Sequence, residues 1–147
     1  MKNVLLVDDD SIFNFLNTKI LQSMGFANDI HTALNGKQAI DLFNDYYGGT
    51  KALPDIILLD LSMPIMDGFG FLEAFRRLDL PGKDNVKVII VTSSNSADDI
   101  KRAKALGVSQ YLTKPIREES LKEALMMAEM LISLNGEGAS VKKPTAP

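Results

Sequence analysis

The residues best suited to chemistry are acids that directly follow two apolar runs. The run Val4–Val7 is followed by three consecutive acids at positions 8–10, and the run Ile56–Leu59 is followed by Asp60. Both runs have the length and aliphatic content of strands that are buried on both faces of a parallel sheet. Ligands bind outside the carboxyl ends of such strands, so these acids lie where a binding or reactive site is expected.

Two further strand ends carry groups that fit phosphate chemistry. Thr92 follows the apolar run Lys87–Val91, and Lys114 follows the run Val108–Thr113. In a doubly wound sheet of strand order 2-1-3-4-5 the first and third strands are neighbours, which brings the acids together. Clustered carboxylates need a cation, and hard oxygen ligands suit Mg²⁺, with Mn²⁺ as the alternative. Mg²⁺ commonly shares its site with a phosphate, to which a lysine and a hydroxyl are natural partners.

Asp60 is the candidate nucleophile of this site. It is the acid at the end of the central strand, facing both the other acids and Lys114, and carboxylates can accept phosphoryl groups. One of the three acids at positions 8–10 must instead cap the helix that follows, because the first N–H groups of a helix need acceptors. His31, the one histidine of the chain, has no acidic or nucleophilic neighbour in the sequence pattern and is assigned a structural or surface role.

The remaining segments supply five strands alternating with five helices, which predicts an α/β three-layer sandwich with a parallel sheet and right-handed crossovers. The weakest strand, Asn28–Ala33, is assigned to a sheet edge. A loop is expected over Tyr47–Pro54, and the sparsely apolar helix Ala97–Leu106 is expected to be the most mobile. The helices are predicted over Ser11–Met24, Gly36–Tyr46, Gly68–Leu78, Ala97–Leu106 and Glu118–Leu134.

Composition fits a single domain with a sizeable core. The 147 residues are 46% hydrophobic and 24% charged, with a net charge of -3 and no cysteine. Disulfides and thiol chemistry are excluded, and no basic stripe favours nucleic acid. No apolar run approaches the ~20 residues of a membrane span, and no signal peptide precedes the first strand. A cytoplasmic protein is expected, with a domain over residues 1–134 and a polar, disordered tail over 135–147.

Together these motifs resemble the receiver domain of two-component response regulators, in its stand-alone, single-domain form. They are Val-Asp-Asp after the first strand, Leu-Leu-Asp-Leu-Ser-Met-Pro with Met-Asp-Gly, Val-Thr-Ser, and Tyr-Leu-Thr-Lys-Pro. The resemblance covers Lys2–Leu134 and implies a flavodoxin-like fold. It also implies a phosphorylation-activated signalling switch that assists its own Mg²⁺-dependent phosphorylation and dephosphorylation without being an ordinary enzyme.

The resemblance implies a role for each matching position of the metal site. Asp9 would bind Mg²⁺ directly and Asp8 chiefly through water. Asp60 would be both phosphoacceptor and metal ligand, and Ser62 would offer its backbone carbonyl to the metal. Asp10 has no implied role.

The same resemblance implies the phosphate-binding and switch residues. Lys114 would be the phosphate-binding lysine, and the Lys114-Pro115 bond resembles the cis-proline junction of the family. Thr92 would be the switch hydroxyl and Tyr111 the switch aromatic. Ile116 stands where Phe is frequent in the family, and the loop from Tyr46 to Pro54 is a few residues longer than the family pattern. Neither departure touches the pocket.

The small side chains of Ser62 and Ser94 lie two residues beyond Asp60 and Thr92. They leave space for an attacking water without a strong base to activate it, so they are expected to tune hydrolysis of the aspartyl-phosphate to a moderate rate.

Partners are implied only as classes. The phosphoryl donor would be a histidine kinase or a histidine phosphotransfer protein, and the signal would pass by protein–protein contact to an unidentified target, with a phosphorylation-dependent homodimer as an alternative. No direct nucleic-acid or membrane partner is expected.

Three alternative hypotheses assign the chain to other classes of protein. A haloacid-dehalogenase phosphatase would want a second Asp where Ser62 stands. A flavodoxin-like FMN carrier would need a phosphate loop where the chain has three acids. A receiver-like module that is never phosphorylated would not need the acids, Thr92 and Lys114 together.

The last predicted helix has two apolar stripes. Leu121, Leu125, Ala128 and Ile132 are expected to face the sheet, whereas Met127, Met130, Leu131 and Leu134 form a second stripe on another face. Wider packing or a returning tail could cover the second stripe. The alternative is a surface for a partner or a second copy, since Met adapts to differently shaped partners.

Overall fold

The computed structural model describes residues 2–48, 52–108 and 110–145. Five parallel strands form one sheet in the order β2-β1-β3-β4-β5. This confirms the predicted fold class and places the weak second strand at an edge. The strands are β1 (Lys2–Val7), β2 (Ala27–Ala33), β3 (Ile56–Leu59), β4 (Lys87–Thr92) and β5 (Gln110–Thr113).

Strand register brings the predicted site residues to one edge of the sheet. Val7, the last residue of β1, pairs with Leu59, the last of β3. On the other side of β3, Leu59 pairs with Ile90 of β4, and Thr92 pairs with Thr113 of β5. The residues that follow β1, β3 and β5 therefore emerge together at the carboxyl edge, as the order 2-1-3-4-5 requires.

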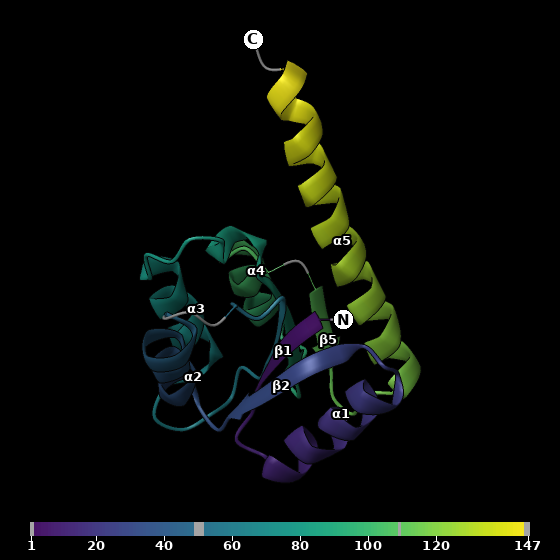
Figure 1. Ribbon diagram of the computed structural model, residues 1–147. Helices are drawn as coiled ribbons and strands as arrows, with labels where there is room; N and C mark the ends of the chain where they lie inside the picture. The colour runs from purple at the N-terminus through teal and green to yellow at the C-terminus, as the bar shows by residue number, and fades with distance from the viewer. Residues whose placement is uncertain (1, 49–51, 109, 146–147) are drawn as a thin grey trace.

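Helices cover both faces of the sheet, as Figure 1 shows. Helices α1 (Ser11–Ser23) and α5 (Glu118–Thr145) lie on one face, and α2 (Gly36–Leu42), α3 (Gly68–Arg77) and α4 (Ala97–Ala105) lie on the other. The face under α2 and α3 is filled by aromatic residues, among which Phe43 and Phe71 are fully buried. The opposite face is aliphatic, with Leu21, Leu121 and Leu125 buried against the strands.

Short polar side chains fix where four of the helices begin. Each N-cap side chain accepts a hydrogen bond from a backbone N–H of the first turn, which otherwise lacks a partner. Asp10 caps α1, Asn35 caps α2, Asp67 caps α3 and Ser96 caps α4. Asp10 is therefore the acid that the sequence required as a cap.

Helical structure extends one residue into the loop predicted over Tyr47–Pro54. After α2 the chain continues as a π-helix over Phe43–Tyr47. Phe43 and Tyr47 are both buried, with ring centroids 5.1 Å apart. Packing against the aromatic core thus overrides the loop signals at this residue, while positions 49–51 of the loop lie outside the described residues. A short 3-10 helix, Lys83–Asn85, also precedes β4 where no element was predicted.

The end of the last helix was predicted too early. Instead of stopping at Leu134, α5 continues to Thr145 and projects beyond the body of the molecule (Figure 1). The prediction placed the polar residues from Gly136 onward outside the helix, yet a glycine inside a helix costs only about 1 kcal/mol relative to alanine. The segment predicted as a disordered tail is therefore helical to Thr145. The division into a domain over 1–134 and a separate tail remains a prediction.

The two apolar stripes of α5 have different surroundings. Leu121, Leu125 and Ala128 are buried against the sheet, as predicted. Met127 and Met130, together with Met126, are exposed. Because α5 runs straight on to Thr145, no returning segment covers these methionines within the described part of the chain.

Two smaller expectations concern His31 and membranes. The expectation that His31 has no acidic neighbour was wrong, because its Nε2 lies 3.1 Å from Asp29 Oδ2, two residues earlier in the same strand; its ring packs 4.7 Å from the Tyr46 ring. Among the helices of the described residues, none combines the length and the apolarity that crossing a bilayer requires.

Candidate phosphoacceptor and metal site

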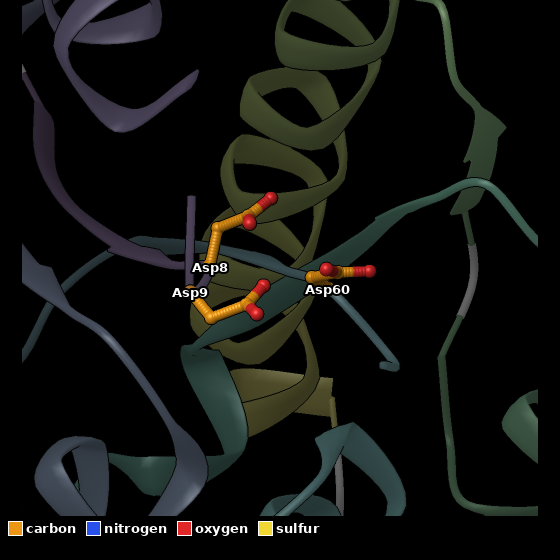
Figure 2. Close-up of side chains that lie close together, drawn as sticks. All are labelled: Asp8, Asp9 and Asp60. Atoms are coloured by element: carbon orange, nitrogen blue, oxygen red, sulfur yellow. The ribbon is translucent and has the colours of Figure 1, made fainter. Parts of the chain in front are cut away.

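Three predicted acids meet at the carboxyl edge of the sheet. Asp8 and Asp9 follow β1 and Asp60 follows β3, and Figure 2 shows the three side chains side by side. One carboxylate oxygen from each lies within 4.8 Å of the others. The backbone N–H of Asp60 donates to the carbonyl of Val7 at 2.9 Å, which ties the two strand ends together. Such a set of oxygen donors with open sides fits Mg²⁺.

Lys114 is the cation of this cluster. Its Nζ donates to Asp8 Oδ2 at 2.7 Å and lies 3.7 Å from Asp60 Oδ2. The same Nζ stands 4.1 Å from the centroid of the Phe13 ring, within the range of a cation–π contact. Its backbone N–H donates to the Thr92 carbonyl at 2.6 Å, and the peptide bond to Pro115 is cis, as the resemblance implied.

Burial sets the electrostatics of the acids. Asp8 is only 3% exposed and Asp60 only 6%. Burial raises the pKa of the Asp8 carboxyl above its ordinary value, and the nearby charge of Asp60 acts in the same direction, while Lys114 and the Asp10 backbone N–H oppose the shift. A single lysine does not compensate the cluster fully, so a divalent cation at these oxygens would relieve the remaining repulsion.

The acid triplet is divided between two tasks. Asp10 turns away to cap α1, with its Oδ1 accepting from the backbone N–H groups of Ile12 and Phe13 at 3.0 and 3.2 Å. Asp8 is fixed in the pocket by the Asp10 backbone N–H at 2.9 Å. The residue order therefore leaves Asp8 and Asp9 for the site and Asp10 for the helix.

The switch residues predicted from the resemblance also lie together. Thr92 is fully buried at the end of β4. The Tyr111 hydroxyl donates to the Ser94 carbonyl at 2.9 Å, which links β5 to the loop before α4. Ser62 and Ser94, the predicted hydrolysis-tuning residues, both line a cavity of about 420 Å³ with Thr92. The Ser62 backbone N–H approaches Asp60 Oδ1 at 3.4 Å, so this cavity adjoins the phosphoacceptor.

Several supporting residues were missed by the sequence interpretation. Phe13 lies under Lys114, and the buried Asn14 donates through Nδ2 to the Asp8 carbonyl at 2.9 Å. Asp99 accepts from Ser94 Oγ at 2.6 Å. A Cβ on Gly68 would stand 2.5 Å from the Asp60 carbonyl, so only glycine fits there. Gly68 belongs to the quoted Met-Asp-Gly motif, although its packing role was not predicted, and the Ser96-x-x-Asp99 spacing of a capping box could have signalled Asp99.

Comparison with known proteins identifies the family. Residues 4–126 match the response regulator receiver domain. Sporulation initiation phosphotransferase F of Bacillus subtilis is 31% identical over 124 residues, which cover 84% of this chain and 90% of that protein. The Escherichia coli nitrate/nitrite response regulator protein NarL is 35% identical over 136 residues, but the match spans only 57% of its length.

Solved structures agree with this assignment. A two component response regulator from Cytophaga hutchinsonii superposes with a TM-score of 0.74 at 31% identity, covering 86% of this chain and 95% of that one. A CheX-CheY-BeF3-Mg complex from Borrelia burgdorferi gives 0.74 at 28% identity, covering 86% and 87%. The fold and the acid cluster define a receiver-type signalling domain. The chain belongs to the receiver-domain family of two-component response regulators.

Mg²⁺ is expected to stabilise the protein against unfolding. A cation that binds only the folded cluster at 100 times its dissociation constant adds about 2.7 kcal/mol. Thermal unfolding in Mg²⁺ and in NaCl of matched ionic strength measures this, with a higher Tm expected in Mg²⁺ only. Asp9→Asn removes one carboxylate of the cluster and should reduce the shift. An equal Tm in both salts would contradict the metal site.

Proposed function

We propose that Asp60 accepts a phosphoryl group from a phosphohistidine of a histidine kinase or histidine phosphotransfer protein, and that the chain acts as a switch between that donor and a target protein. The observation that carries the proposal is the juxtaposition of Asp8, Asp9 and Asp60 with Lys114 at one sheet edge. The proposal also includes the cytoplasmic location that the sequence predicts.

In the transfer, a carboxylate oxygen of Asp60 forms the new P–O bond while the P–N bond to the donor histidine breaks and the imidazole keeps its electron pair. Asp8, Asp9, Asp60 and the Ser62 backbone carbonyl would hold Mg²⁺. When bound, the ion supplies positive charge against which the phosphoryl oxygens are oriented and stabilised. Lys114, already 3.7 Å from Asp60 Oδ2, is the side chain placed to exchange its carboxylate partners for a phosphoryl oxygen.

Readout is proposed to pass through α4, β5 and α5. The Thr92 hydroxyl donates to a second phosphoryl oxygen and vacates volume into which Tyr111, whose hydroxyl donates to the Ser94 carbonyl, can turn. α4 is the element suited to respond, because Ala103 is its only fully buried side chain in the described structure. The exposed methionines of α5 provide apolar surface for a target protein, with a phosphorylation-dependent homodimer as the alternative.

The proposal is tested by mass. Incubating the protein with Mg²⁺ and acetyl phosphate should add one phosphoryl group, and fragmentation should place it on the peptide that contains Asp60. The same incubation with excess chelator should leave the mass unchanged. A phosphoryl group on a different residue, or no gain with Mg²⁺ present, would refute the assignment.

A further inference from the structure

The hydrogen bond between Ser94 and Asp99 is not used by the proposed phosphoryl transfer. Ser94 Oγ donates to Asp99 Oδ2 at 2.6 Å, and the Ser96 backbone N–H approaches the same Oγ at 3.3 Å. In an ordinary capping box the acid at the third helical position bonds the N-cap N–H directly. In this chain the Ser94 hydroxyl is inserted between the Ser96 N–H and the Asp99 carboxylate. Asp99 therefore holds the side chain of Ser94, which lines the cavity next to the phosphoacceptor.

The bond pattern determines what the Ser94 hydroxyl can still do. A serine hydroxyl has one proton to donate and two lone pairs to accept with. Its proton is committed to Asp99, and one lone pair faces the N–H of Ser96. One acceptor position remains, so the hydroxyl is able to accept a hydrogen bond from a water but has no proton left for a phosphoryl oxygen.

Space for such a water is present. Ser94 and Asp99 line the cavity of about 420 Å³ that Ser62 and Thr92 also line. A water takes a share of only about 30 Å³ in the liquid, so the cavity has room for one beside a phosphoryl group. The cavity adjoins Asp60 through the Ser62 backbone N–H, at 3.4 Å from Asp60 Oδ1.

We infer that Asp99 is a positioning residue for hydrolysis of the aspartyl-phosphate: by taking the Ser94 proton, it leaves Ser94 Oγ as the acceptor that orients the attacking water. This inference rests on the proposed function. The water oxygen forms the new P–O bond, the Asp60 oxygen keeps the electron pair of the bond that breaks, and both water protons leave with inorganic phosphate. Asp99 acts on the attacking water only through Ser94.

Removing Asp99 frees the Ser94 proton. The hydroxyl then donates to a phosphoryl oxygen or to the water itself, and donation to the water lowers the nucleophilicity of the attacking oxygen. We therefore expect Asp99→Ala to slow dephosphorylation by about threefold or more, a size typical of residues that act through a shared hydrogen bond.

The experiment follows decay of the phosphorylated protein by intact mass after acetyl phosphate is removed and Mg²⁺ is retained. Wild type, Asp99→Ala, Ser94→Ala and the double variant are compared. The double variant should decay at the rate of Ser94→Ala. Asp98→Ala is the matched control, because Asp98 carries the same charge in the first turn of α4 but is exposed, and it should decay like wild type.

The outcomes separate the inference from the proposed function. If wild type gains no phosphoryl group, the proposed function fails and the inference falls with it. If all variants gain the group, an Asp99→Ala decay equal to wild type overturns the inference alone. An equal slowing by Asp99→Ala in the Ser94→Ala background also overturns it, since Asp99 would then act through the stability of α4 and not through Ser94.

Discussion

Asp60→Asn is expected to gain no phosphoryl group under conditions in which the wild-type protein gains one. The amide keeps the size and the buried place of the carboxylate, which is 6% exposed, but offers no anionic oxygen to form the P–O bond. It also removes one of the three carboxylates that cluster within 4.8 Å. Intact mass after incubation with Mg²⁺ and acetyl phosphate measures the loss, which should be complete.

Asp10→Asn is the matched control for that loss. It makes the same chemical change at a neighbouring strand end, but Asp10 caps α1 and does not belong to the cluster. Asparagine caps helices about as well as aspartate does, so the fold is kept. Asp10→Asn should therefore be phosphorylated like wild type. Phosphorylation of Asp60→Asn to the wild-type extent would show that another residue is the acceptor.

Phe71→Ala is expected to destabilise the protein strongly, lowering the free energy of unfolding by about 3–5 kcal/mol. Phe71 is fully buried in α3 and stacks on Phe75, with ring centroids 5.6 Å apart and planes at 19°. Its ring also lies 6.2 Å from that of Phe43. Truncation leaves a cavity, because the surrounding aromatic rings are rigid and cannot easily move to fill it. Urea unfolding followed by circular dichroism measures the change.

Phe15→Ala provides the control for the loss of an aromatic ring. Phe15 is 59% exposed on α1, and its ring centroid lies 5.3 Å from Lys19 Nζ. An exposed cation–π contact contributes about 0.5–1 kcal/mol, so Phe15→Ala should cost less than about 1 kcal/mol. Similar losses for the two variants would mean that the aromatic layer under α3 does not stabilise the fold in the way described.

The sheet was predictable because its signals are local and agree with one another. The aliphatic runs of β1, β3 and β4 are too uniformly apolar for any position other than the interior of a parallel sheet. Their order followed from the alternation of strands and helices. Helix ends were less predictable, because the polar residues after Leu134 and the loop residues from Tyr47 onward give weak signals that packing or simple helix propagation can override.

The candidate site was also predictable only in part. Asp8, Asp9, Asp60 and Lys114 could be brought together from the sequence, since each follows a strand and the strand ends meet. The contacts of Phe13, Asn14 and Asp99 could not, because they depend on side-chain directions of α1 and on the path of the loop before α4. The sequence interpretation thus found the groups that react but not most of those that orient them.

The strand order also bears on how the chain reaches its fold during synthesis. β1 emerges first and occupies an interior place, β2 adds on one side of it, and β3, β4 and β5 add in turn on the other side. Each new strand therefore finds its partner already made, and pairing does not wait for a distant segment, as it must in many parallel sheets with long-range contacts. The exception is the aliphatic face of the sheet, which only α1 covers, and only in part, until α5 arrives with Leu121 and Leu125. A nascent chain that lacks α5 would expose this face, and that is the stage at which aggregation competes most strongly with folding.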